Sequence, residues 1–139
     1  MSALAVSDVL KAARLQGMQS WLDAGDGNAR IQIMGGDWPG AGVDGGTELA
    51  VIELAKPCGK VEGGVLALIS TTNNLVAASG EAIWARMVTA GGHWALDCAV
   101  APKGAGTGGL SIDGAAAGSN GGVLLYKGGL LPPVSLRLT

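Results

Sequence analysis

Glycine, proline and asparagine divide most of this chain into short apolar stretches. From Gly27 onward, stretches rich in apolar and β-branched residues recur at intervals of roughly 8–15 residues between these breakers, a spacing typical of an all-β sandwich or barrel. We therefore expect a mainly β fold, an antiparallel, jelly-roll-like β-sandwich of about eight strands. The candidate strands are Ala29–Met34, Thr47–Leu54, Val61–Ser70, Glu81–Thr89, His93–Val100, Gly108–Asp113, Gly122–Lys127 and Val134–Leu138.

Three of these stretches alternate between apolar and polar residues, which predicts strands with one face in water. The apolar members are Ile31 and Ile33, then Trp94, Leu96 and Cys98 with Asp97 on the opposite face, and finally Val134, Leu136 and Leu138. Between two candidate strands, Gly91-Gly92 predicts a hairpin turn. The segment 35–46, GGDWPGAGVDGG, is predicted to be an exposed loop carrying Trp38. That indole can pack back onto its own domain or insert into a partner.

One amphipathic helix is predicted near the N-terminus, from Ser7 to Leu22. Ser7 is a good N-cap, and Asp23-Ala24-Gly25 provides a stop signal. Apolar residues recur every three or four positions, which predicts one apolar face: Val6, Leu10, Ala13, Gly17 and Trp21. We expect an N-terminal helix or arm over residues 1–24 and a single β-sandwich domain over 25–139, the helix lying on its own sheet or on a neighbouring subunit.

Charged side chains are too scarce to cover the surface of a separate monomer. They make up 14% of the 139 residues, against about 25% in a typical domain. Some apolar surface should therefore remain exposed, and such surface usually marks an interface with a partner. The net charge of −2 and the scattered basic residues argue against nucleic-acid binding. The longest uncharged stretch, Gly63–Gly80, contains too many polar residues to span a membrane.

Candidate catalytic, cofactor and metal motifs each have a simpler structural explanation. His93, the single histidine, stands beside the expected hairpin turn. Residues 104–109 match G-x-G-x-x-G, but another strand is expected after them where a dinucleotide site needs a helix. The acidic turn at residues 23–28 lacks the ligand spacing of an EF-hand. We expect no catalytic residue, no cofactor and no metal ion.

Acidic and sulfur-bearing side chains are further candidates for chemistry. Four glutamates could in principle form a glycosidase pair, although solvated strand faces are the favoured explanation: Glu48, Glu53, Glu62 and Glu81. The spacing of Cys58 and Cys98 does not require a disulfide, and we expect both thiols to be reduced.

Five short segments resemble small structural proteins encoded among the head genes of tailed bacteriophages. They are Ala13–Gln16, Leu22–Gly25, Ala29–Ile33, Ala82–Arg86 and Trp94–Val100. In size and expected β content the chain is similar to the jelly-roll capsid cement, or decoration, protein family known from a Bordetella phage. The resemblance implies a virion protein that is not an enzyme and that binds the outer capsid surface after synthesis in the host cytoplasm.

The implied partner is the major capsid protein, which homodimers of the cement protein would bridge to stabilise the icosahedral shell. We expect the helix, the Trp38 loop and edge strands to make the contacts, with Leu10, Trp21, Trp38 and Tyr126 as interface residues. An alternative is a tail or baseplate component that binds host carbohydrate through Trp38 or Trp94. A small hydrolase using His93 or a carboxylate pair is a further alternative.

Overall fold

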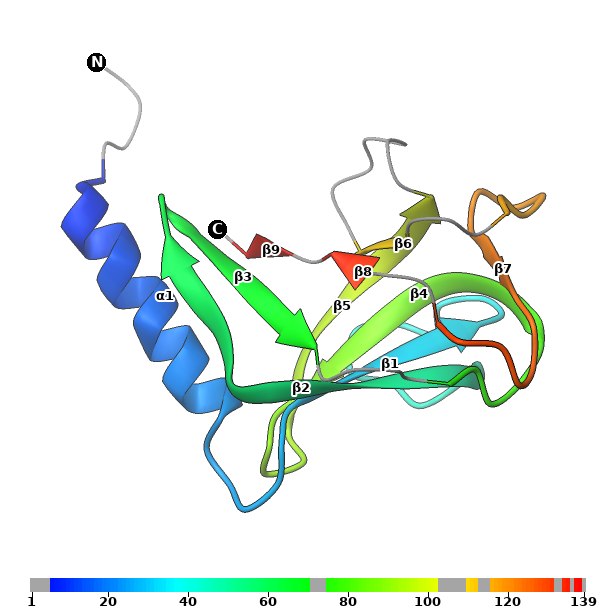
Figure 1. Cartoon of the computed structure of the whole chain (residues 1–139), viewed down its shortest axis with the longest axis horizontal. Helices are drawn as coiled ribbons and strands as arrows, with labels where there is room; N and C mark the ends of the chain where they lie inside the picture. The colour runs from blue at the N-terminus through cyan, green and yellow to red at the C-terminus, as the bar shows by residue number, and fades with distance from the viewer. Residues whose placement is uncertain are drawn as a thin grey trace.

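In the described part of the chain, one helix precedes a series of strands (Figure 1). The computed structural model describes residues 6–70, 75–102, 110–112, 116–131, 134–135 and 137–138, the last two pairs by their backbone alone. The helix is α1 (Asp8–Leu22). The strands are β1 (Arg30–Gly35), β2 (Thr47–Glu62), β3 (Val65–Ser70), β4 (Gly80–Val88), β5 (Trp94–Pro102), β6 (Leu110–Ile112), β7 (Val123–Leu125), β8 (Val134–Ser135) and β9 (Arg137–Leu138).

The strands form one continuous sheet that curls into a half-barrel, so the expected mainly β, jelly-roll-like fold is confirmed. The order across the sheet is β8-β6-β5-β4-β1-β2-β3-β9, and β7 pairs with β4 beside this path. β8 and β9, at the two ends of this order, are one residue apart in the sequence. Because β8 pairs with β6 and β9 with β3, two strands that are neighbours in the sequence lie at opposite edges of the curled sheet.

Apolar side chains from both arms of the curl form one continuous core. Ile31 and Ile33 of β1 are buried while Arg30 is exposed, which confirms the predicted alternation in this strand. Leu66 of β3 and Leu110 of β6 join the same cluster. The pairing of β5 with β6 is parallel, although the expectation was an antiparallel sandwich. A three-residue strand carries no pattern that specifies its direction, so the sequence could not have revealed this pairing.

The second strand is much longer than predicted. β2 pairs with β1 through its first half and with β3 through its second half, and it bends between Leu54 and Gly59, where the register with β3 shifts (Figure 1). The expected strand Val61–Ser70 is wrong, because Gly63 and Gly64, with φ of 60° and 76°, turn the chain between β2 and β3. Two consecutive residues with positive φ make a two-residue hairpin turn, which glycine forms without steric strain.

The helix begins and ends where the sequence predicts, but it buries a different face. The Ser7 hydroxyl accepts a hydrogen bond of 3.1 Å from the Leu10 N–H, and Asp23 is the C-cap. Leu15 and Leu22 are fully buried against the sheet, where the helix contacts β2 and β3. The predicted apolar stripe through Leu10 and Trp21 points to solvent instead, because its members lie about a third of a turn away from the buried face.

The hairpin between β4 and β5 holds the C-terminal end of α1. Its turn forms at the predicted place, with a hydrogen bond of 2.9 Å from the Gly92 N–H to the Thr89 carbonyl. The Ala90 N–H donates to the Leu22 carbonyl at 2.8 Å, which satisfies one of the carbonyls left without partners at a helix end. Gly25 lies so close to this turn that a Cβ atom there would stand 2.6 Å from the Gly91 nitrogen. The fold therefore requires a glycine at position 25.

Candidate functional site

A buried ion pair occupies the outer face of the sheet. Arg86 of β4 and Asp97 of β5 stand directly opposite each other across the hairpin. Arg86 Nε donates to Asp97 Oδ1 at 2.7 Å and Arg86 Nη2 donates to Oδ2 at 3.0 Å, a bidentate arrangement. Only 9% of the Arg86 side chain and 7% of the Asp97 side chain are accessible to solvent. The two charges therefore depend on each other for neutralisation.

Two tryptophans are fixed by the same carboxylate. Trp38 Nε1 donates to Asp97 Oδ2 at 2.9 Å, and Trp94 Nε1 donates to Asp97 Oδ1 at 3.0 Å. The Gly42 N–H adds a longer bond of 3.4 Å to Oδ2. Asp97 thus accepts five hydrogen bonds, two of them from Arg86. Trp38 and Trp94 remain 52% and 45% exposed, and we call this pair of indoles the platform.

The loop between β1 and β2 is held over the sheet by the same ion pair. Arg86 Nη1 donates to the Val43 carbonyl at 2.9 Å, and Nη2 reaches the Gly40 carbonyl at 3.3 Å. The backbone of Gly42 lies against the Trp94 ring, where a Cβ atom would stand 3.2 Å from Trp94 Cε3. The predicted loop therefore packs back onto its own domain, while the Trp38 ring stays half exposed.

The charges of the pair are stable over the ordinary pH range. Burial alone would raise the pKa of Asp97, but hydrogen bonds from Arg86, Trp38 and Trp94 outweigh burial and hold that pKa well below its usual value. The hydrogen bond to Asp97 raises the pKa of Arg86, against the opposing effect of burial. Both groups therefore carry their charges at neutral pH.

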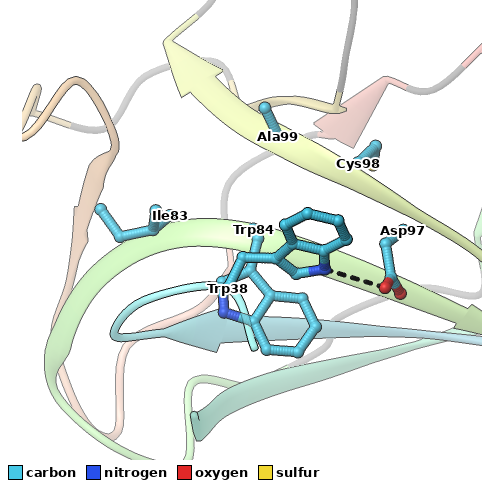
Figure 2. A pocket seen from close by; sticks show the side chains of 6 residues that line it. All are labelled: Trp38, Ile83, Trp84, Asp97, Cys98 and Ala99. Atoms are coloured by element: carbon cyan, nitrogen blue, oxygen red, sulfur yellow. Dashed lines mark hydrogen bonds between the residues drawn. The ribbon is translucent and has the colours of Figure 1, made fainter. Parts of the chain in front are cut away.

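A cavity of about 360 Å³ opens beside the platform (Figure 2). Its walls are largely carbon, and its lining residues are Trp38, Ile83, Trp84, Asp97, Cys98 and Ala99. Figure 2 shows the Trp38 indole reaching over the sheet toward Asp97, with Cys98 and Ala99 on the strand behind. Below the platform, the Arg86 guanidinium lies 4.9 Å from the centre of the buried Trp84 ring, within the range of a cation–π contact.

The position of Trp94 differs from the predicted alternation. We expected Trp94 on the same face as Leu96 and Cys98, opposite Asp97. The pairing passes from Met87 with Leu96 to Val88 with Trp94, so one extra residue, Ala95, is inserted in β5. Such a β-bulge reverses the facing of the residues beyond it. The bulge therefore brings the Trp94 indole to the same face as Asp97. The alternation of apolar and polar residues does not reveal a bulge, so this position could not be predicted from the sequence.

The four predicted interface residues lie in three separate exposed apolar patches. Leu10 and Trp21, 58% and 49% exposed, belong to the outer face of α1, which we call the helix patch. Trp38 belongs to the platform. Tyr126 follows β7 and is exposed together with Leu75 and Leu130, which are joined by a backbone bridge; we call these three residues the β7 patch. α1 and β7 lie at opposite ends of the molecule in Figure 1.

The acidic turn at residues 23–28 binds an ammonium group of the protein itself. Lys56 Nζ donates to the Gly25 carbonyl at 2.6 Å and to the Gly27 carbonyl at 3.1 Å. Asp23 Oδ2 accepts from the Cys58 N–H at 3.1 Å. These contacts attach the end of α1 to β2. Within the described residues, no group of three or more His, Cys, Asp and Glu side chains is arranged to hold a metal ion.

The four candidate glutamates do not converge on one cavity. Glu81 lines a polar cavity of about 500 Å³ and accepts hydrogen bonds of 3.0 Å from the backbone N–H groups of Asn120 and Gly122. Glu53 lines a different cavity, of about 390 Å³. Glu62 pairs with Lys60 on the surface at 3.4 Å. The G-x-G-x-x-G segment, residues 104–109, lies outside the described residues.

Both cysteines are free thiols, as predicted. Burial, together with the nearby Asp23 carboxylate, raises the pKa of Cys58 to about 12. Burial also raises the pKa of Cys98, which lines the cavity beside the platform. A thiol with a raised pKa is a poor nucleophile, because the thiolate is the reactive form.

Sequence reasoning singled out Trp38 and Trp94 but missed Arg86 and Asp97, the residues that position them. No helix in the described part of the chain has the length and apolar character needed to cross a lipid bilayer. Comparisons with protein-family models, with curated proteins and with solved structures found no match.

Proposed function

We propose that this chain is a structural protein of a tailed-phage virion, a cement protein that binds the outside of the capsid and bridges subunits of the major capsid protein. The observation that carries the proposal is that large apolar side chains are exposed in several separate places on one small domain, among them the helix patch, the platform and the β7 patch. α1, which carries the helix patch, and β7, which Tyr126 follows in the sequence, lie at opposite ends of the molecule (Figure 1). A protein that joins separate subunits needs contact surfaces that face in different directions.

The composition of each patch suits a protein contact. Tryptophan, tyrosine and leucine provide the patches, and Trp and Tyr are enriched among residues that contribute most to binding energy. Each patch is too small for a stable interface by itself, since such interfaces bury about 800 Å² on each partner. On a capsid lattice, however, binding at one patch raises the effective concentration at the next. Several weak contacts then give firm retention.

The location and copy number of the protein test this proposal directly. Quantitative mass spectrometry of purified particles of the encoding phage should find on the order of hundreds of copies, in proportion to the major capsid protein, as shell symmetry requires. About six to twelve copies per particle would instead match the rings of a tail. The second result would support the tail or baseplate alternative and contradict the cement function. Absence from particles would contradict both.

A double substitution in the helix patch tests the contact surface without disturbing the core. Leu10→Ser together with Trp21→Ser removes two exposed apolar side chains, whereas deletion of the whole helix would also remove the buried Leu15 and Leu22. We expect the double variant to fold normally and to be lost from particles on heating or dilution.

The matched control changes exposed polar residues of the same helix, Gln16→Ala and Ser20→Ala. This control should be retained like the unchanged protein. Equal retention of the helix-patch variant and the control would show that α1 makes no contact with the shell.

A further inference from the structure

Neither indole of the platform has a free N–H group to offer a ligand. Trp38 and Trp94 are each about half exposed, yet both N–H groups are already bonded to Asp97. Five bonds to two carboxylate oxygens leave Asp97 little capacity to accept another donor. A ligand must therefore be recognised by the exposed carbon atoms of the two rings and by the carbon walls of the adjoining cavity.

This chemistry disfavours a sugar at the platform. A sugar ring can stack on an indole, but its hydroxyl groups need hydrogen-bond partners when water is displaced from them. The cavity offers almost no polar surface, and its one charged lining residue, Asp97, is already engaged. The cavity volume of about 360 Å³ lies at the small end of the range for ligand sites, about 300–1,000 Å³. Its size suits a single long side chain.

The charges around the platform favour a cation. Arg86 is neutralised by Asp97, with which it forms a bidentate pair. A further carboxylate belongs to the same loop: Asp44 follows Val43, whose carbonyl is bonded to Arg86. Asp44 is exposed, and it is near enough for its charge to act on Arg86. Asp44 therefore adds a negative charge near two half-exposed indole rings, and the π systems of such rings attract cations.

We infer that the platform binds an arginine side chain of the protein partner, with the guanidinium stacked on the Trp38 and Trp94 rings and the aliphatic stem in the adjoining cavity. A guanidinium is flat and weakly hydrated, and it stacks on aromatic faces more readily than an ammonium group does. The Arg86–Asp97 pair holds both indoles in position before the partner arrives, which reduces the entropy lost on binding. This inference rests on the proposed function for the statement that the partner is a protein.

The isolated protein provides the test, because each of its four tryptophans gives its own indole N–H signal in an NMR spectrum. The signals are assigned with Trp→Phe variants, and Nα-acetyl-arginine amide is then added. Nα-acetyl-citrulline amide has the same shape without the charge, and should bind about tenfold more weakly. Nα-acetyl-leucine amide and methyl glucoside test an apolar guest and a sugar. Trp21 is the internal control, since it is similarly exposed but lies on α1.

We expect a saturable shift of the Trp38 and Trp94 signals with the arginine probe, and none at Trp21. Asp44→Asn should weaken binding by about two- to threefold, as the loss of one nearby charge in water predicts, while Glu62→Gln should leave it unchanged. The inference would be overturned if the citrulline, leucine or glucoside probe bound as tightly as the arginine probe. It would also be overturned by an unchanged affinity in Asp44→Asn, or by no shift at all. None of these results depends on a capsid, so they are independent of the particle experiments that test the proposed function.

Discussion

Replacing Asp97 with asparagine should destabilise the whole fold, because the substitution leaves a buried arginine without its counter-charge. In the unchanged protein, each carboxylate oxygen of Asp97 accepts a hydrogen bond from Arg86. Whichever way the new amide is oriented, its NH₂ group takes the place of one of these oxygens and faces an Arg86 donor. The same group would also oppose the N–H of Trp38 or Trp94. Removing one member of a buried ion pair costs about 3–5 kcal/mol. We expect about 3 kcal/mol, the low end, because movement of the covering loop would admit water to Arg86.

Urea unfolding followed by far-UV circular dichroism measures this loss. For a domain of this size a loss of 3 kcal/mol corresponds to a fall in Tm of about 10 °C. The matched control is Glu62→Gln, which removes the charge of an exposed pair whose side chains are 72% and 76% accessible. Such a pair contributes at most about 1 kcal/mol. A similar small loss for both variants would refute the conclusion that Asp97 organises the site.

The pH dependence provides a second check on the same group. The folded-state pKa of Asp97 lies below its unfolded value of about 3.9. The stabilisation that the Asp97 carboxylate provides is therefore complete at pH values above the unfolded pKa. It is lost as the pH falls toward the lower folded pKa. The stability difference between the unchanged protein and Asp97→Asn should be constant from neutral pH to about pH 5, and it should shrink below about pH 4. A difference that persists undiminished at low pH would contradict the assignment.

Further predictions concern the helix, two glycines and the thiols. Leu15→Ala should cost about 2–5 kcal/mol in urea unfolding, since this side chain is fully buried; a loss below about 1 kcal/mol would mean that α1 is not docked. Gly17→Ala should stabilise the protein by about 0.5–1 kcal/mol, because the position is an open site within a helix. Gly25→Ala should destabilise the protein by at least about 1 kcal/mol, because of the positive φ at this position and the contact with the Gly91 backbone. A destabilising Gly17→Ala or a stabilising Gly25→Ala would contradict these two assignments. Cys58 and Cys98 should resist a thiol reagent at pH 8 and react only after unfolding in guanidinium, whereas fast reaction of the folded protein would contradict their raised pKa values.

The fold class was predictable because the glycine breakers and the alternating strands specify it locally. Ile31 and Ile33 are buried as their alternation requires, and the turn at Gly91-Gly92 forms where expected. The errors arise where position depends on distant pairing. The bend of β2 and the bulge at Ala95 are defined by neighbouring strands, so a single stretch of sequence does not reveal them.

The candidate site was partly accessible from the sequence. Counting outward from the predicted turn at Gly91-Gly92 brings Arg86 opposite Asp97, so the ion pair could have been found from the hairpin register. The contact between Trp38 and Asp97 could not have been predicted in this way. These residues are 59 positions apart, and only the folded sheet defines how their elements lie relative to each other. The face of α1 was predicted wrongly for a related reason: two apolar stripes exist, and packing selects the one through Leu15 and Leu22.

The pairing of β8 and β9 with opposite edges of the sheet has a consequence for how the protein is made. β9 pairs with β3, about 70 residues earlier in the chain, so this contact closes a long loop and belongs to the slow class of folding events. A ribosome-bound chain that has not yet exposed residues 134–138 offers two unpaired strand edges, β3 and β6, to any neighbouring nascent chain. Synthesis of many copies close together would therefore favour mispairing between copies at these edges. Once β8 and β9 have emerged and paired, both edges are covered.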